Sequence, residues 1–182
     1  MGTNQLIPHP ERPPLAVTAI TVRLDTRDPY WLRLRWRIEG TGKLVAPPFA
    51  GRTRREGLWR TTCFELFVRP AAAGERYAEF NLSPSEAWAA YDFAAYRQGM
   101  ADRTMPRAPC CTMRPGRQFA LFDAALPFAS LPPLPWRAGL SAVIEEEGRH
   151  LSYWALAHLP GKPDFHDPAC FALHVSAPKG ES

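Results

Sequence analysis

Two glutamates, an asparagine and a tryptophan lie in the middle third of the chain, within segments that alternate polar and apolar residues. They are Glu65, Glu79, Asn81 and Trp88. A tryptophan ring can stack on the apolar face of a sugar ring, while carboxylates and amides hydrogen-bond polar groups of a ligand. Two carboxyl groups about 5–9 Å apart are also the pair that glycoside hydrolysis requires. These residues indicate either a sugar-binding or a sugar-cleaving site if they share one surface.

The segments that carry these residues have the two-residue period of β-strands. In FELFV the apolar positions are mostly even, which places Glu65 on the face away from the core. In YAEFNL, Phe80 is expected inside, with Glu79 and Asn81 outside. In WAAYDF the odd positions are expected inside, which places Trp88 outside. The stretch from 58 to 93 therefore predicts a three-stranded antiparallel meander with one polar outward face.

The turns predict how these strands align. A tight hairpin that pairs Ser83 with Glu86 sets Asn81 opposite Trp88. The longer loop at 70–76 sets Glu65 opposite Asn81, which gives a row across three strands. A shift of one residue in either loop would move the side chains of a strand to its other face.

Other aromatic and charged residues could complete this site. Trp59, at the start of the first segment, and Trp154 could form a second wall, with Arg60 and Glu79 beside the row. The alternative is a packed sheet edge in which Glu65 pairs with a neighbouring arginine. The predicted ligand-binding residues are Glu65, Asn81, Trp88, Trp59, Arg60, Glu79 and Trp154.

A second polar group occurs in the segment HLPGKPDFH, which contains His158, Asp164 and His166. Histidine and carboxylate side chains are ligands for Zn²⁺ and other divalent cations. Their spacing matches no common zinc motif, and a loop held by hydrogen bonds is the alternative interpretation. The three residues are nevertheless the candidate metal ligands of this chain.

Composition limits the classes of protein to consider. The chain has 182 residues, 46% of them hydrophobic and 22% charged, with a net charge of +4. Arg33, Arg35 and Arg37 alternate along one segment, which favours a solvent-exposed basic face over nucleic-acid binding. No apolar run is long enough to span a bilayer, so no membrane partner is expected. The first residues have no signal-peptide pattern and the four cysteines have no CxxC spacing, so we expect reduced thiols and a cytoplasmic protein.

The chain is punctuated by 20 prolines that separate short alternating segments. This pattern is typical of a β-sandwich or barrel, and we count nine or ten strands. Residues 1–14 are polar and proline-rich and are expected to form a flexible arm. A single domain is expected over residues 15–176, followed by a tail at 177–182.

Several of these segments resemble a known family. LWRTTCFELFVRP, YAEFNLSPSEAWAAYDFAAYRQGM and LSYWALAHLPGKPDFHDPACFAL are similar to the bacterial DOMON-like domains, which are related to family 9 carbohydrate-binding modules. The resemblance implies an immunoglobulin-like antiparallel β-sandwich whose relatives bind sugars and, in some branches, haem. We therefore expect a non-catalytic module for a glycan or another small polar ring. The alternatives are a haem- or metal-binding module, and a hydrolase that uses Glu65 and Glu79; the oligomeric state and the ligand stay open.

Overall fold

The computed structural model describes residues 2–72 and 74–176, and strands dominate it. The strands are β1 (Thr3–Pro8), β2 (Ala19–Asp25), β3 (Trp31–Glu39), β4 (Leu44–Val45), β5 (Cys63–Pro70), β6 (Tyr77–Leu82), β7 (Trp88–Phe93), β8 (Ala101–Asp102), β9 (Cys110–Arg114), β10 (Phe119–Pro127), β11 (Trp136–Glu146), β12 (His150–Ala155) and β13 (Leu173–Val175). The helices are short 3₁₀ turns: η1 (Thr41–Lys43), η2 (Leu58–Arg60), η3 (Phe128–Ser130) and η4 (Pro168–Cys170). None of the described helices is long and apolar enough to cross a membrane.

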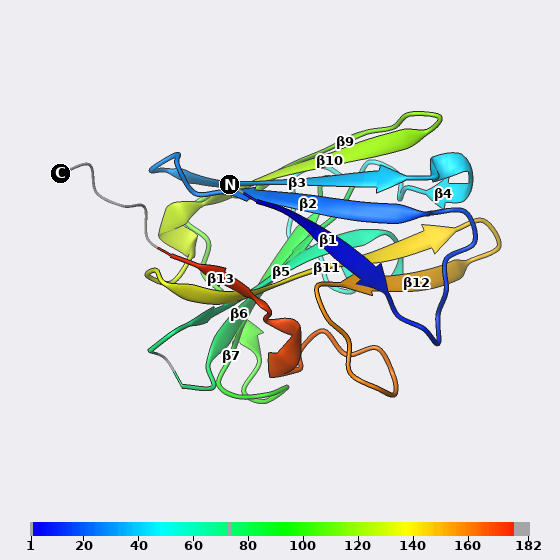
Figure 1. The fold of residues 1–182 in the computed structure, drawn as a ribbon. Helices are drawn as coiled ribbons and strands as arrows, with labels where there is room; N and C mark the ends of the chain where they lie inside the picture. The colour runs from blue at the N-terminus through cyan, green and yellow to red at the C-terminus, as the bar shows by residue number, and fades with distance from the viewer. Residues whose placement is uncertain (1, 73, 177–182) are drawn as a thin grey trace.

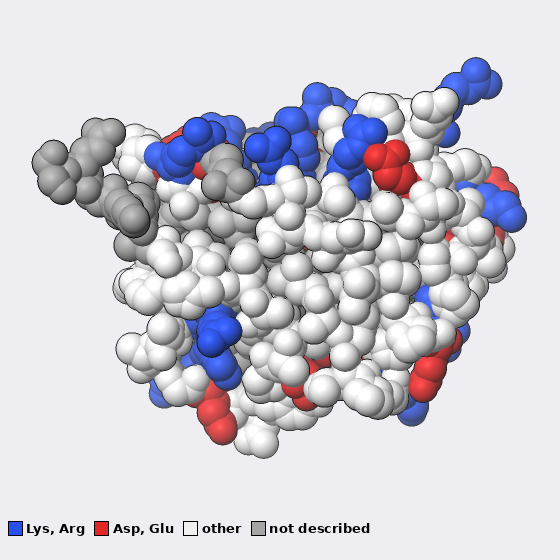
Figure 2. Space-filling view, in the orientation of Figure 1, with Lys and Arg blue, Asp and Glu red and all other residues white. Residues whose placement is uncertain are grey.

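The strands form two layers that face each other (Figure 1). Sheet A has the strand order β1-β2-β3-β10-β9, and sheet B has the order β8-β7-β6-β5-β11-β12, with β4 and β13 also paired to β11. Neighbouring strands in both sheets are antiparallel. The predicted antiparallel all-β architecture is thus confirmed, but the thirteen strands of the described residues exceed the expected nine or ten. Basic side chains gather along the upper edge of the molecule, where sheet A lies (Figure 2).

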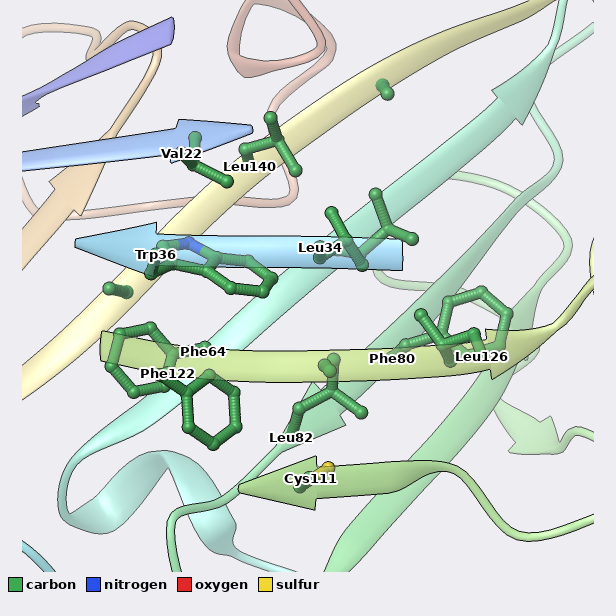
Figure 3. Close-up of a cluster of buried hydrophobic side chains, with 14 of the residues drawn as sticks. Val22, Leu34, Trp36, Phe64, Phe80, Leu82, Cys111, Phe122, Leu126 and Leu140 are labelled. Atoms are coloured by element: carbon green, nitrogen blue, oxygen red, sulfur yellow. The ribbon is translucent and has the colours of Figure 1, made fainter. Parts of the chain in front are cut away.

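The core lies between the two sheets and is built from the inward face of each (Figure 3). Phe122 of sheet A stacks on Phe64 of sheet B at 4.2 Å between ring centroids, and Trp36 contacts both rings. All three side chains are fully buried. Strand alternation therefore produces one continuous apolar interior, as the sequence pattern predicts.

The N-terminal residues are part of the sheet, so the prediction of a flexible arm over residues 1–14 is wrong. Thr3–Pro8 forms β1, which pairs first with β2 and then with β12, so one strand joins the two sheets. Only Leu6 of this strand is buried, which explains why no hydrophobic period marked it. Beyond β1, the fully buried Glu146 carboxylate accepts hydrogen bonds from the backbone N–H groups of residues 15–17. The predicted tail at 177–182 lies outside the described residues.

The outer face of sheet B is covered by two connections, although strand alternation alone would leave it open to solvent. Ala50 and Leu58 come from the connection before β5, and Phe165 and Phe171 from the connection after β12. The latter approaches closely because the sheet carries Gly139 there: a Cβ atom would lie 2.9 Å from the Phe171 ring. Polar residues on this face of the sheet are therefore buried.

Candidate functional site

A row of small and polar residues crosses the outer face of sheet B. Ser141 of β11 pairs with Glu65 of β5, Glu65 pairs with Asn81 of β6, and Asn81 pairs with Ala89 of β7. The predicted juxtaposition of Glu65 and Asn81 is confirmed. Glu79 lies on the same face, two residues from Asn81 along β6. All the polar members of this group are nearly inaccessible to solvent.

Trp88 is not part of this row, because the hairpin before it contains one more residue than predicted. Its partner across the ladder is Leu82, and its side chain belongs to the core between the sheets. The N–H of Ser83 donates to the carbonyl of Ala87 at 3.0 Å, which leaves a three-residue loop. Glu86 ends that loop at φ 68°, as in three-residue hairpins that finish in the left-handed region. The extra residue reverses the facing of the whole third strand, so the expected inward and outward positions of β7 are exchanged.

The other two predicted tryptophans lie apart from the polar row. Trp154 is buried in the core, where its indole N–H donates to the Ser152 hydroxyl at 3.0 Å. Trp59 lies on η2, which packs against β5 and β6, and half of its surface is exposed. The guanidinium of Arg60 lies 5.4 Å from its ring centroid. The predicted second wall therefore lacks Trp154, while Trp59 and Arg60 lie on η2 beside β5 and β6.

Hydrogen bonds join the polar side chains of the row. Asn81 Nδ2 donates to Glu79 Oε1 at 2.8 Å, and the Ser141 hydroxyl donates to Glu65 Oε2 at 3.1 Å. Asn81 Oδ1 is buried and has no hydrogen-bond partner among the described residues. Because Asn81 lies directly opposite Glu65, a protonated Glu65 could supply the missing donor.

Burial favours that protonated form. Loss of solvation raises the pKa of Glu65 from 4.5 to about 8, and repulsion from Glu79 adds to the rise. Loss of solvation also raises the pKa of Glu79 to about 7, although its hydrogen bond from Asn81 lowers it in part. The two carboxyl groups titrate as a pair, so near neutral pH they hold at least one proton between them.

His166 connects this buried pair to the surface. Its Nδ1 lies 2.8 Å from the Tyr77 hydroxyl, which also accepts the backbone N–H of Arg97. In the tautomer in which Tyr77 donates to Nδ1, the imidazole proton lies on Nε2, which faces Glu79 Oε2 at 3.7 Å. Burial lowers the pKa of His166 to about 4, so near pH 6 this contact joins two neutral groups rather than an ion pair.

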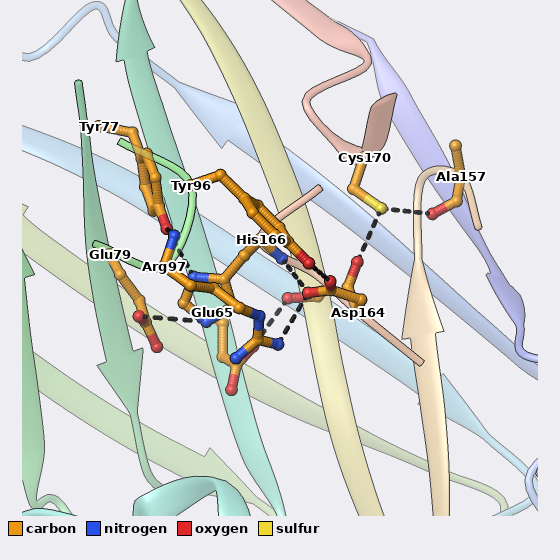
Figure 4. A network of polar contacts seen from close by, with 10 residues as sticks. Glu65, Tyr77, Glu79, Tyr96, Arg97, Ala157, Asp164, His166 and Cys170 are labelled. Carbon is orange, nitrogen blue, oxygen red and sulfur yellow. Dashed lines mark hydrogen bonds and ion pairs between the residues drawn. The ribbon is translucent and has the colours of Figure 1, made fainter. Parts of the chain in front are cut away.

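Tyr96, Arg97 and Asp164 form the exposed rim of the network, and we call these three residues the rim (Figure 4). Arg97 Nη2 pairs with Asp164 Oδ1 at 2.8 Å, and the Tyr96 hydroxyl donates to the other oxygen of the same carboxylate. Asp164 also accepts the backbone N–H of His166. Tyr96 is 46% exposed, so its ring is available to a ligand.

The sequence pattern did not bring the rim residues together. Tyr77, which lies behind the rim, has the same strand parity as Glu79 and Asn81, so the pattern does place it on their face. Tyr96 and Arg97 lie in a turn after β7 in which Arg97 adopts a φ of 53°, and nothing in the local sequence connects that turn to Asp164.

The predicted metal ligands have separate partners. His158 Nε2 lies 2.9 Å from the carbonyl of Ile7, Asp164 binds the rim residues, and His166 contacts Tyr77. Among residues 2–72 and 74–176 no group of three or more His, Cys, Asp or Glu side chains is arranged to hold a metal ion. His158, Asp164 and His166 therefore do not form the metal site that their residue types suggested.

Comparison with known proteins identifies the fold. No family model matches the sequence, and no curated protein matches it. A crystal structure of a proposed carbohydrate-binding protein from Bacteroides uniformis aligns over 96% of this chain and 85% of its own, with a TM-score of 0.64 and 16% identity. A family 9 carbohydrate-binding module from Caldicellulosiruptor kristjanssonii, in complex with glucose, aligns over 79% of this chain and 69% of its own, with a TM-score of 0.48 and 8% identity. The chain thus shares its fold with the Bacteroides protein.

Proposed function

We propose that this protein is a non-catalytic carbohydrate-binding module of the DOMON-like type. The observation that carries the proposal is the rim: an exposed aromatic ring lies beside a guanidinium and a carboxylate, and a buried hydrogen-bond network stands behind them. The likeness to the Bacteroides protein supports it, since that protein is itself proposed to bind carbohydrate. A sugar presents to such a site one apolar face and several hydroxyl groups, which are the features that the rim can bind.

In the proposed complex, Tyr96 stacks on the sugar ring. Arg97 donates hydrogen bonds to hydroxyl oxygens and Asp164 accepts them from hydroxyl groups. Both charged groups already contact each other in the free protein, so little side-chain entropy remains to be lost on binding.

The buried residues then act as positioning residues. Tyr77 fixes the backbone at Arg97, and the backbone of His166 fixes Asp164. Glu79 faces His166 from β6 and is itself held by the hydrogen bond from Asn81. The sequence suggested the polar row as the surface that contacts the sugar. We instead assign that contact to the rim and place the polar row beneath the rim.

Burial also argues against the hydrolase alternative. Glu65 and Glu79 lie on neighbouring strands, but they are only 3% and 6% exposed. A glycosidic oxygen must come within hydrogen-bond distance of a general acid. No such approach is open here, so we do not propose cleavage by this pair.

Replacing Tyr96 with alanine tests the proposed site. We expect one or more sugars in a panel of glucose, xylose, N-acetylglucosamine, cellobiose and UDP-glucose to bind by isothermal titration calorimetry. The Tyr96→Ala variant should bind that sugar on the order of tenfold more weakly, because stacking and its buried area are lost. Tyr30→Ala is the matched control, since Tyr30 is also an exposed tyrosine but lies just before β3, in sheet A. Equal affinities of the two variants, or no binding by the unaltered protein, would contradict the proposal.

A further inference from the structure

An open hollow of about 510 Å³ lies on the outer face of sheet A, on the opposite side of the molecule from the rim. Its lining comes from four neighbouring strands and one turn. The charged side chains of the lining are Arg23, Asp25, Arg27, Arg33, Arg35 and Asp123. Thr112 and Cys110 of β9 complete one wall. Basic side chains dominate this edge of the molecule in Figure 2.

The strand register concentrates positive charge in the hollow. Arg23 of β2 lies directly opposite Arg35 of β3, which in turn lies opposite Asp123 of β10. Like charges that face each other across a ladder destabilise a sheet. Asp123 relieves the pair only in part, because the same carboxylate also binds Arg114.

Among the arginines that line the hollow, Arg23 is the one without an ion pair to a described residue. Arg27 pairs with Asp25 at 2.9 Å, and Arg33 pairs with Asp28 at 3.0 Å. Within the described part of the chain Arg23 forms no ion pair, and its side chain is exposed. An oxyanion between Arg23 and Arg35 would satisfy the free guanidinium and remove the repulsion across the ladder.

The arginines are close enough for one anionic group to contact two of them. Residues two apart on a strand are separated by about 7 Å, and neighbouring strands lie about 4.8 Å apart. Guanidinium groups match carboxylate, sulfate and phosphate groups in a bidentate manner. Single-stranded nucleic acids are held by aromatic platforms as well as by basic grooves, and no aromatic side chain lines this hollow. The lining therefore favours an anionic chain without bases.

We propose that the outer face of sheet A binds an acidic polysaccharide, with carboxylate or sulfate groups held by Arg23 and Arg35. This site is separate from the rim and does not depend on the function proposed for it. It is a second proposed binding surface, on the opposite side of the molecule from the rim.

The test uses heparin as a sulfated chain, polygalacturonate as a carboxylated chain and dextran as a neutral chain, each titrated at low ionic strength into the 182-residue chain. One or both acidic polymers should bind, dextran should not bind at this face, and added salt should weaken binding. Arg23→Gln should lower the affinity on the order of tenfold, because a charge-assisted contact is lost.

Arg137→Gln is the matched control. Arg137 is exposed on sheet B and lies directly opposite Arg69, so this variant removes the same charge from the same kind of pair. Its affinity should stay within about twofold of the unaltered protein, since it leaves the hollow intact. The proposal would be overturned if neither acidic polymer binds, if both variants lose affinity equally, or if a single-stranded oligonucleotide binds more tightly than both polymers.

Discussion

Replacing Trp88 with alanine should lower the free energy of unfolding by about 3–5 kcal/mol, the usual cost of removing a large aromatic side chain from a packed interior. Trp88 is 8% exposed and contributes to the core between the sheets. The guanidinium of Arg54 also lies 4.7 Å from its ring centroid and would lose that contact. Chemical denaturation followed by circular dichroism measures the effect.

Trp59→Ala is the control for this experiment. Trp59 is half exposed on η2, so its removal should change stability by less than about 1 kcal/mol. If Trp88 instead lay on the outer face and stacked on a sugar, its removal would affect ligand affinity more than stability. Such a result would mean that the register of β7 described above is incorrect.

Glu65→Gln should stabilise the protein above pH 8 by roughly 5 kcal/mol, and the gain should disappear near pH 5. In the folded protein the pKa of Glu65 is about 8, against 4.5 as its ordinary value. Between these two values the folded state binds more protons than the unfolded state, so stability falls as the pH rises through this window. Glutamine preserves the size of the side chain and cannot ionise, which removes the penalty.

The comparison is clearest between pH 6.5 and 9. Below pH 6.5 the buried His166 acts in the opposite direction: its pKa of about 4 means that the unfolded chain takes up the proton more readily, and stability falls on acidification. Glu75→Gln, at an exposed position in the loop before β6, should leave the pH profile unchanged. Urea midpoints measured at several pH values decide the matter, and identical profiles for Glu65→Gln and the unaltered protein would contradict the predicted burial effect.

The sequence predicts a segment well where its two faces differ in polarity. In β5 and β6 the apolar and polar positions are separated clearly enough to place Glu65 opposite Asn81. In β7 the residues are mostly apolar on both faces, so the pattern alone does not show which face Trp88 occupies. The length of the hairpin decides it, and the three-residue hairpin requires a left-handed backbone at Glu86. Trp154 was misplaced for a different reason: it shares its face of β12 with the polar residues His150 and Ser152, yet Ser152 and Trp154 are buried.

Contacts between distant segments left no local signal. The outer face of sheet B is covered by residues near positions 50 and 170, and the rim joins a turn after β7 to the loop before η4. Neither contact changes the pattern of polar and apolar residues within the segments that make it. The network of Tyr77, His166 and Arg97 therefore becomes visible only in three dimensions.

Because β1 is shared between the sheets, its loss would have two effects at once. Its hydrogen bonds end at β2 on one side and at β12 on the other. Without it, each of those strands would present a row of unpaired N–H and C=O groups to solvent, which is a template for pairing with another molecule. A variant that lacks residues 1–8 should therefore expose two unpaired strand edges, at β2 and β12, and be prone to aggregate through them.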